Sequence, residues 1–205
     1  MYWTTIKTQV TICSWGLKMD NNFEKALAQT LKNEGVIGNK TGYVNAKTDA
    51  GGETNYGITI AKARECGYRG KMCDLPYEKA AEIYRTEYWV KTKAHKIQNF
   101  AIAFLLFDFA VNAGVATACK KLQTAINKVM SVKLTIDGII GQKTLAELDT
   151  IQQSPYWYHA KLEKVFIAEI LAYYTSLKST KTGFAKNGAG WVNRVVNNIK
   201  FLIGV

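Results

Sequence analysis

Apolar residues recur at helical spacing over most of the chain, which predicts a mainly helical protein. The first such segment is predicted to begin at Asp20 or Asn21, either of which can cap a helix, and to end at about Asn33. Further helices are predicted after Thr59, over 77–95 and 98–113, from about 115, from near Gln142, over 155–178 and from 190–191. Because residues 98–113 are apolar on nearly every side, we expect them to form a buried central helix.

One long stretch, from residue 34 to residue 59, breaks this helical pattern. It reads EGVIGNKTGYVNAKTDAGGETNYGIT, and a run this polar and rich in glycine cannot form a packed helix. Its segments GYVNA and TNYGIT predict a small β-hairpin around the turn TDAGGE. Since loops of this length are usually functional or disordered, we interpret the stretch as a site supported by helices and not as an idle surface loop.

Composition narrows the classes of partner. The chain has 205 residues, 48% of them hydrophobic, enough for one good core or two small, closely packed lobes. A formal net charge of +11 favours a polyanionic partner such as nucleic acid, an acidic membrane surface or an anionic cell wall; simple solvated lysines are the alternative.

Neither a nucleic-acid partner nor stable membrane insertion is expected. The positive charge is the only feature that would favour nucleic acid, because the sequence has no RNP-like, helix-turn-helix or zinc-finger spacing. The longest apolar run, 100–111, is too short to span a bilayer, so no stable membrane insertion is expected.

Neither a metal site nor a cofactor is expected. The four cysteines, at 13, 66, 73 and 119, form no CxxC pair, and only two histidines are present. Cys66 and Cys73 could form a disulfide in a secreted protein, but free thiols are the more ordinary interpretation. Residues 1–18 show no signal-peptide pattern, so we interpret them as an N-terminal extension before a domain that starts at Met19. Export would then depend on a holin or another non-classical route.

Glu34 and Asp49 have the settings that acid hydrolysis of a glycosidic bond requires. Glu34 falls at the end of the first helix, where Gly35 supplies the stop and the negative end of the helix dipole favours a protonated carboxyl. Asp49 lies beside the amides of a glycine-rich turn, which suits an ionised carboxylate. One carboxyl would donate a proton to the leaving oxygen while a second group activates water or stabilises the developing cation. An ordinary surface role for Glu34 is the alternative, and Glu53 is a rival second carboxylate.

Two polar residues, Asp108 and Asn112, interrupt the predicted central helix one turn apart. Because buried polar groups need partners, we expect these side chains to bind loop backbone or to line a cleft.

These segments also resemble the signature of a known family. Glu34-Gly35, the run GYVN at 42–45, the run DAGGETNYGIT at 49–59 and FDFAVNAG at 107–114 resemble glycoside hydrolase family 108, N-acetylmuramidases that include phage endolysins and secretion activators. The resemblance implies a lysozyme-like α+β fold, with a helical bundle around the central helix and the hairpin beside an active-site cleft. It implies that Glu34 is catalytic, and the order Glu, Asp, Thr, similar to the triad of phage-type lysozymes, suggests catalytic roles for Asp49 and Thr54. The expected substrate-binding residues are Tyr43, Asn55, Tyr56 and Asn112.

The sequence departs from the family pattern at VIGNKT, residues 36–41, which separates Gly35 from Gly42-Tyr43. A bulged-out loop would leave Glu34 in its relation to Asp49, whereas any other arrangement would displace it.

The second half, residues 115–205, is similar to the predicted peptidoglycan-binding domain that follows these catalytic domains. The expected peptidoglycan-binding residues are Asp137, Gly138, Gly141 and Thr144, in a D-G-x-x-G-x-x-T arrangement that a turn followed by a capped helix would also explain. A GWxNR string at 190–194 matches as well. We expect residues 19–114 and 115–205 to pack as one compact unit.

The resemblance implies a monomeric muramidase that acts on the cell wall or in the periplasm. It would hydrolyse the β-1,4 bonds between N-acetylmuramic acid and N-acetylglucosamine in peptidoglycan glycan strands. The alternative is a non-catalytic wall-binding module or a secretion-associated protein.

Overall fold

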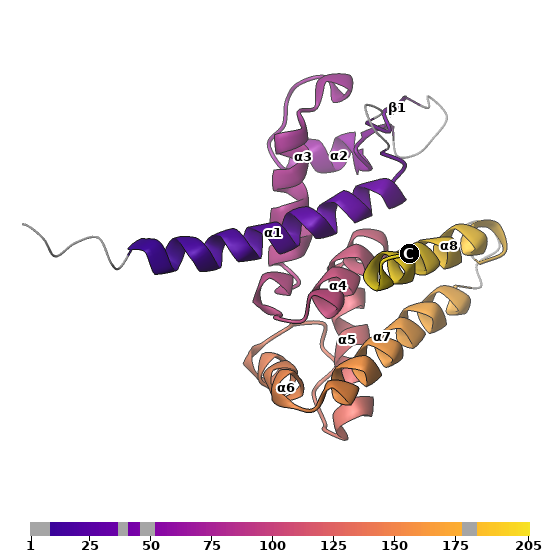
Figure 1. The fold of residues 1–205 in the computed structure, drawn as a ribbon. Helices are drawn as coiled ribbons and strands as arrows, with labels where there is room; N and C mark the ends of the chain where they lie inside the picture. The colour runs from indigo at the N-terminus through magenta and orange to yellow at the C-terminus, as the bar shows by residue number, and fades with distance from the viewer. Residues whose placement is uncertain (1–8, 37–40, 46–51, 178–183) are drawn as a thin grey trace, which may run out of the picture.

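A computed structural model describes residues 9–36, 41–45, 52–177 and 184–205, and the side chains of these residues outside 9–20 and 184–186. The protein is mainly α, as predicted, with a small sheet at one end (Figure 1). Its α-helices are α1 (Gln9–Asn33), α2 (Ile60–Glu65), α3 (Tyr77–Tyr84), α4 (Phe100–Ala113), α5 (Val115–Met130), α6 (Gln142–Gln153), α7 (Tyr156–Ser176) and α8 (Phe184–Ile203). The remaining helical turns are 3₁₀ (Met72–Asp74, Ala94–Lys96) and π (Arg85–Val90).

The predicted central helix is α4. The side chain of Asn99 caps it by accepting a hydrogen bond from the Ile102 N–H, and every residue from Ile102 to Ala110 is buried. Helices α1, α5 and α7 pack directly against α4. The all-round apolar pattern therefore identified the core correctly.

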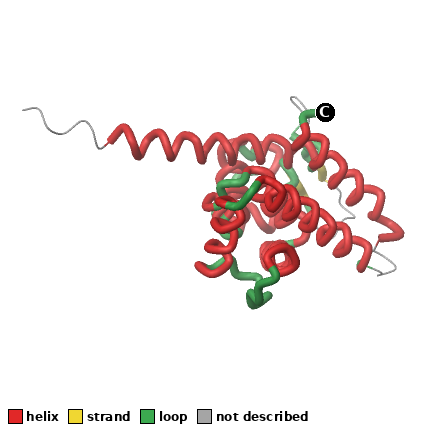
Figure 2. The backbone as a smooth tube through the Cα atoms, turned by 60° about the horizontal axis from the view of Figure 1, so that its bottom comes forward, coloured by secondary structure: helices red, strands yellow, loops and turns green. Residues whose placement is uncertain are grey.

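Two helix starts were predicted wrongly. Helix α1 begins at Gln9, so Asp20 and Asn21 lie inside it instead of capping it, and the expected boundary at Met19 falls within the helix. Its first turns extend beyond the body of the protein (Figures 1 and 2). Helix α8 begins at Phe184, before the expected start at 190–191. In both cases the pattern contained residues that often end helices, but Asp, Asn and Gly cost only about 1 kcal/mol or less in a helix, and no proline intervenes.

The predicted helix over 77–95 changes its winding part-way. After α3 the chain continues as the π-helical segment Arg85–Val90. Within this wider turn Trp89 faces the core and is 3% exposed.

The predicted hairpin is present, and a third strand extends it. Strand β2 (Glu53–Asn55) pairs antiparallel with β1 (Val44–Asn45) and with β3 (Ile58–Thr59). Thr59 then caps α2, as its hydroxyl accepts a hydrogen bond of 3.2 Å from the Lys62 N–H. The sheet and α2 lie near the C-terminal end of α1 (Figure 1), which brings the glycine-rich stretch to the helix that carries Glu34.

Candidate active site

The end of α1 fixes the position of Glu34. The Val36 N–H donates to the carbonyl of Leu31 (2.9 Å) and the Gly35 N–H to that of Lys32 (3.1 Å), while Gly35 has φ +83°. This is a Schellman C-cap, which requires a residue with positive φ after the helix. The prediction that Gly35 stops the helix at Glu34 is confirmed.

The two ends of the VIGNKT insertion lie close together, beside Glu34. A Cβ atom on Gly42 would lie 3.6 Å from both the Glu34 carbonyl oxygen and Val36 Cγ2. The carbonyl of Thr41 accepts a 2.8 Å hydrogen bond from the Tyr56 N–H. The residues between these ends lie outside the described part, but the closeness of the ends is what a bulged-out loop requires. Glu34 therefore stays next to the sheet.

The turn between β2 and β3 closes against the Glu34 side chain. Tyr56 (φ +50°) and Gly57 (φ +72°) form a two-residue turn of the type I′ kind. A Cβ atom on Gly57 would lie 2.9 Å from Glu34 Cγ, 3.0 Å from its Oε2 and 2.9 Å from Tyr84 Oη. The Tyr84 hydroxyl donates to the Tyr56 carbonyl at 2.8 Å and so holds the turn in place. The glycine-rich motif and the predicted catalytic glutamate thus face each other.

We expect Gly57→Ala to destabilise the protein by about 1–3 kcal/mol and to reduce its hydrolytic activity, because strain at positive φ adds to a collision with Glu34. Gly67→Ala is the matched control, since Gly67 also has positive φ (+82°) but a Cβ there meets nothing within 4 Å. Urea denaturation and wall-clearing assays measure the two effects. Equal losses in both variants would contradict a close contact between this turn and Glu34.

An arginine from the second half of the chain binds Glu34. Arg194 on α8 donates from Nη1 to Glu34 Oε1 at 2.7 Å, and from Nε and Nη2 to the carboxylate of Asp108 at 2.9 and 2.8 Å. The side chains of Arg194 and Asp108 are 8% and 3% exposed, whereas that of Glu34 is 23% exposed. One guanidinium therefore joins a buried carboxylate to a carboxylate that reaches the surface.

Asp108 is held by polar side chains from α1 and α8. Its carboxylate accepts hydrogen bonds from the Thr30 hydroxyl (3.0 Å), the Asn33 amide (3.3 Å) and the Asn198 amide (2.6 Å). The expectation that Asp108 binds loop backbone was wrong, because its partners are helix side chains. Its burial in an apolar helix is balanced by these donors and by Arg194.

The charges in this cluster hold Arg194 ionised. Burial by itself lowers the pKa of Arg194, but the carboxylates of Asp108 and Glu34 more than offset this and raise it well above its usual value. Since Arg194 binds Oε1, the opposite oxygen, Oε2, lies against the turn at Gly57.

The other two predicted catalytic residues are placed differently. Asp49 lies outside the described residues. Thr54 lies in β2, half-buried, opposite Val44 on β1 and Thr59 on β3. Because side chains alternate along a strand, the rival carboxylate Glu53 points to the other face of the sheet from Thr54.

The predicted substrate-binding residues divide into two groups. Asn55 is completely buried; its amide donates to the Met72 carbonyl at 2.6 Å and its Oδ1 accepts from the next N–H, so it holds the sheet. Tyr43 is 39% exposed, the half-buried Tyr56 packs edge-on against the ring of Tyr77, and Asn112 is exposed. Asn112 Oδ1 accepts a 2.9 Å hydrogen bond from the Tyr174 hydroxyl, and a substrate contact by any of these three side chains stays a prediction.

The predicted peptidoglycan-binding motif forms a loop fastened to α5. Gln123 donates to Asp137 Oδ1 (2.8 Å) and accepts from the Gly138 N–H (2.9 Å). Gly138 has φ +83°, and a Cβ there would lie 2.9 Å from the Ala116 carbonyl oxygen. Gly141 directly precedes α6, and Thr144 is 3% exposed within that helix. The arrangement explains these residues as supports of the fold, and a ligand contact by them stays a prediction.

Asp137 gives this loop an acid-sensitive contact. The hydrogen bond from Gln123, with a further one from the Ile139 N–H, lowers the pKa of Asp137 below its usual value. A lowered folded-state pKa adds stability above the unfolded-state pKa, and this stability is lost as the pH falls through the folded value. We expect Gln123→Leu to raise the Asp137 pKa toward its ordinary value, measured by NMR titration of its carboxyl carbon. An unchanged pKa would contradict this account.

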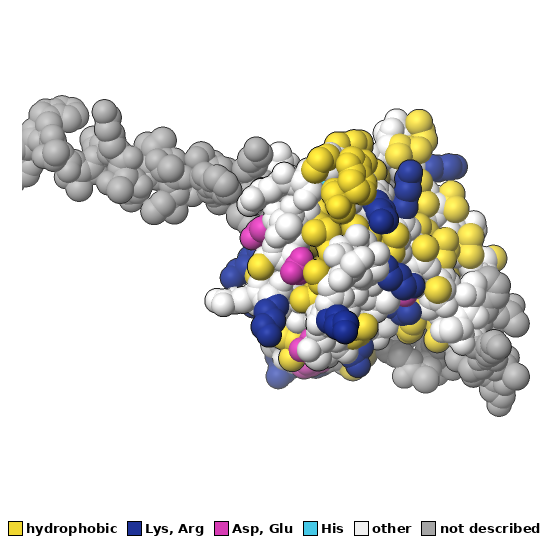
Figure 3. All heavy atoms as spheres, turned by 90° about the horizontal axis from the view of Figure 1, so that it is seen from below, with side chains coloured by type: hydrophobic (Ala, Val, Ile, Leu, Met, Phe, Trp, Pro, Cys, Tyr) yellow, Lys and Arg dark blue, Asp and Glu magenta, His cyan; other side chains and the backbone are white. Residues whose placement is uncertain are grey.

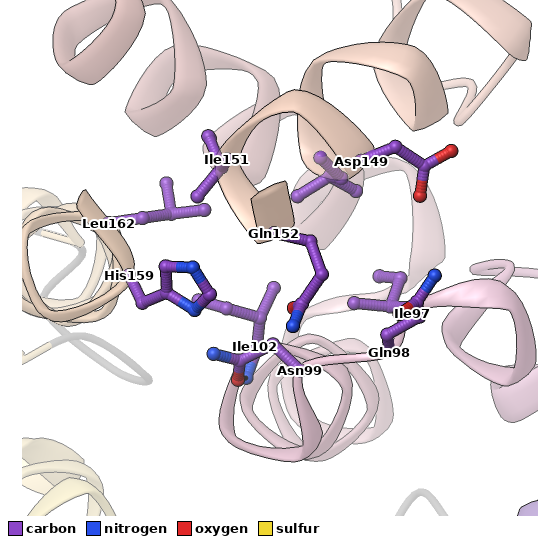
Figure 4. Close-up of a pocket in the computed structure, with 10 residues that line it drawn as sticks. Ile97, Gln98, Asn99, Ile102, Asp149, Ile151, Gln152, His159 and Leu162 are labelled. Atoms are coloured by element: carbon purple, nitrogen blue, oxygen red, sulfur yellow. Dashed lines mark hydrogen bonds between the residues drawn. The ribbon is translucent and has the colours of Figure 1, made fainter. Parts of the chain in front are cut away.

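A separate cavity, between the start of α4, α6 and α7, is too small for a sugar. It holds about 20 Å³ and is lined by residues that include Asn99, Gln152 and His159 (Figure 4). His159 Nε2 is buried there without a hydrogen-bond partner among the described residues. The volume suits a single water molecule and excludes this cavity as a glycan site.

Within the described part of the chain, no cluster of three or more His, Cys, Asp or Glu side chains could hold a metal ion, and no helix is long and apolar enough to cross a membrane.

Residues 27–114 match the family model described as Glycosyl hydrolase 108. This segment is therefore similar to glycosyl hydrolase 108 domains. It contains Glu34, Gly57 and Asp108, so three parts of the cluster lie within the matched segment, whereas Arg194 lies beyond it on α8. The match confirms the family that the sequence resembles.

Solved structures extend the similarity beyond the matched segment. SagA of Brucella abortus is 29% identical, with a TM-score of 0.68, over 90% of this chain and 95% of that one. The shared fold therefore continues into the half that supplies Arg194. No curated protein shows a significant match to the chain.

The part that Arg194 plays in this cluster was not predicted from the sequence, in which the residue stands out only as part of the GWxNR string at 190–194. The available signal was Asp108, since a carboxylate in an apolar helix requires a cationic or hydrogen-bonding partner.

Proposed function

We propose that the protein is an N-acetylmuramidase, which cleaves the β-1,4 bond between N-acetylmuramic acid and N-acetylglucosamine in peptidoglycan. The observation that carries this proposal is the setting of Glu34, the glutamate of the family signature. Glu34 directly follows the last residue of α1, and its side chain lies against the turn at Gly57. One of its carboxylate oxygens accepts a hydrogen bond from Arg194. With 23% of the side chain exposed, it is open to substrate while most of it contacts protein.

In the proposed reaction, Glu34 acts as the general acid. Because Arg194 donates to Oε1, the proton is carried by Oε2. It passes to the glycosidic oxygen as the bond from that oxygen to C1 of N-acetylmuramic acid breaks, and the N-acetylglucosamine side leaves with a hydroxyl group. Water adds to C1 and loses its proton to a base.

We propose Asp49 as the ionised group that faces C1, and Thr54 as the residue that holds the attacking water. A water held in this way favours inversion at C1. Glu53 lies on the opposite face of β2 from Thr54 and lines a separate pocket, which favours Thr54 over Glu53 as the second group. The contacts of Tyr43, Tyr56 and Asn112 with the glycan are part of the same proposal.

One observation favours a second candidate, a wall-binding module without catalysis. The guanidinium of Arg194 lies 2.7 Å from Glu34, so one oxygen of the proposed catalytic carboxyl is already used by an ion pair that links the two halves of the chain. In either case the wall is the target, and the net charge of +11 would attract anionic wall polymers less strongly as salt rises. Lys and Arg side chains are scattered over the face seen from below, where few acidic side chains appear (Figure 3).

Analysis of the new chain ends separates these candidates. Purified peptidoglycan is incubated with the protein, and the new reducing ends are converted to sugar alcohols with borohydride. Muramidase activity yields muramitol. Glucosaminitol would show that the other glycosidic bond is cut, and binding without new reducing ends would establish the wall-binding module instead.

A further inference from the structure

A second recess lies beside the sheet, on the face of β2 to which Glu53 points. It is an open pocket of about 340 Å³, within the range of small-ligand sites. Three of its lining residues are cationic, Arg64, Arg69 and Lys71, while Glu53 is its one acidic lining residue in the described part of the chain. The pocket therefore carries a net positive charge, which favours an anionic ligand.

Hydrogen bonds join Arg64, at the end of α2, to the loop that carries Arg69 and Lys71. Arg64 Nη1 donates to the Tyr68 carbonyl (2.8 Å), Arg69 Nη1 donates to the Arg64 carbonyl (2.6 Å), and the Tyr68 hydroxyl donates to the Lys71 carbonyl (2.9 Å). A guanidinium has five N–H donors, and each arginine uses one of them in these bonds. The two arginines are thus held in place and still have donors for a ligand.

The pocket is also anchored to the sheet that faces Glu34. The buried amide of Asn55 holds the Met72 carbonyl at the pocket floor. Tyr43, on the pocket wall, directly follows Gly42, which lies against the backbone of Glu34. The pocket and the proposed catalytic acid are therefore connected through the same small sheet.

We propose that this pocket binds the carboxylate-bearing peptide that branches from the glycan strand. The proposal rests on the proposed function, because such peptides are attached to the N-acetylmuramic acid that Glu34 would address. Arginine forks bind carboxylates with two parallel hydrogen bonds, and Lys71 adds a mobile charge. Glu53 accepts hydrogen bonds from the amide or ammonium groups of the peptide. The pocket then selects glycan that still carries its peptides.

The test measures binding in a Glu34→Gln background, so that turnover does not interfere. The probes are a disaccharide with its peptide, the same disaccharide without it, and inorganic phosphate. Arg69→Gln/Lys71→Gln is compared with Lys161→Gln/Lys164→Gln, which removes the same charge from exposed positions on α7. We expect the pocket variant to weaken binding of the peptide-bearing probe about tenfold or more and to leave the peptide-free probe unchanged. The single variant Lys71→Gln, which keeps the Arg69 hydrogen bond, should shift binding in the same direction.

Cys73 provides an independent readout, because it is exposed and lines the pocket. The peptide-bearing disaccharide should slow its alkylation, followed by peptide mass spectrometry, while the peptide-free disaccharide and phosphate should not. Equal effects on both disaccharides, equal weakening in the α7 control, or protection by phosphate alone would overturn the proposal. If Glu34→Gln abolishes cleavage while the pocket variants bind normally, the peptide site fails and the muramidase stands. If the wild type does not cleave but the pocket binds the peptide, the muramidase proposal fails and the peptide site stands.

Discussion

Glu34→Gln should lose cleavage of peptidoglycan by about 10²–10⁴-fold while the protein remains folded. The amide cannot donate the proton that the leaving oxygen requires, but its carbonyl oxygen can still accept the hydrogen bond from Arg194. Arg194 also keeps its bonds to Asp108, so no buried charge is left without a partner. The rate of clearing of purified peptidoglycan and the midpoint of urea denaturation measure these two quantities.

Glu24→Gln is the matched control for this experiment. Glu24 lies on the same helix, its side chain is 50% exposed, and it pairs with Arg85 at the surface. The substitution removes the same charge from an exposed side chain that does not bind Arg194, and it should leave clearing within about a factor of two, since a surface ion pair contributes little. A comparable loss in both variants would mean that charge on α1, and not acid catalysis, explains the effect.

Arg194→Met should cost about 3–5 kcal/mol of unfolding free energy and should also abolish efficient cleavage. The substitution leaves the buried carboxylate of Asp108 without its cation, which is among the most destabilising single changes in a protein core. It also frees the Glu34 oxygen that the guanidinium holds. Urea denaturation and clearing assays give the two effects.

A double variant separates the two consequences of losing Arg194. Asp108→Leu/Arg194→Met removes both buried charges, so stability should recover in large part. Cleavage should remain low, because Glu34 still lacks its anchor. A loss below about 1 kcal/mol in Arg194→Met, or full activity in the double variant, would contradict the role given to this ion pair.

Local features of the fold were predictable from the sequence. Gly35 ends α1 because a residue with positive φ was needed there, and Thr59 caps α2 because its hydroxyl satisfies an N–H. The apolar pattern at 98–113 predicted the central helix correctly, because a helix that is apolar on nearly every side must be buried on nearly every side. The starts of α1 and α8 were missed, because residues that favour caps and turns are also tolerated inside helices.

The candidate site was predictable only in part, because its key contacts join distant parts of the chain. The glycine-rich stretch was expected beside Glu34, but the contact that the structure describes is at Gly57 and not at the predicted turn TDAGGE, most of which lies outside the described residues. The link from Glu34 through Arg194 to Asp108 spans both halves of the protein, and no periodicity or spacing encodes it. Asn55 belonged to the family signature but is used for support, which only its burial reveals. A motif therefore names the neighbourhood of a site more reliably than the role of each residue.

The role of Glu34 as proton donor is tested most directly by changing the leaving group. Wild type and Glu34→Gln are compared on peptidoglycan and on a 2,4-dinitrophenyl glycoside of the same sugar, whose phenolate leaves without protonation. A general acid matters little for such a substrate, so the deficit of Glu34→Gln should fall from about 10²–10⁴-fold on peptidoglycan to less than about tenfold. An equal deficit on both substrates would show that Glu34 does not act as the acid.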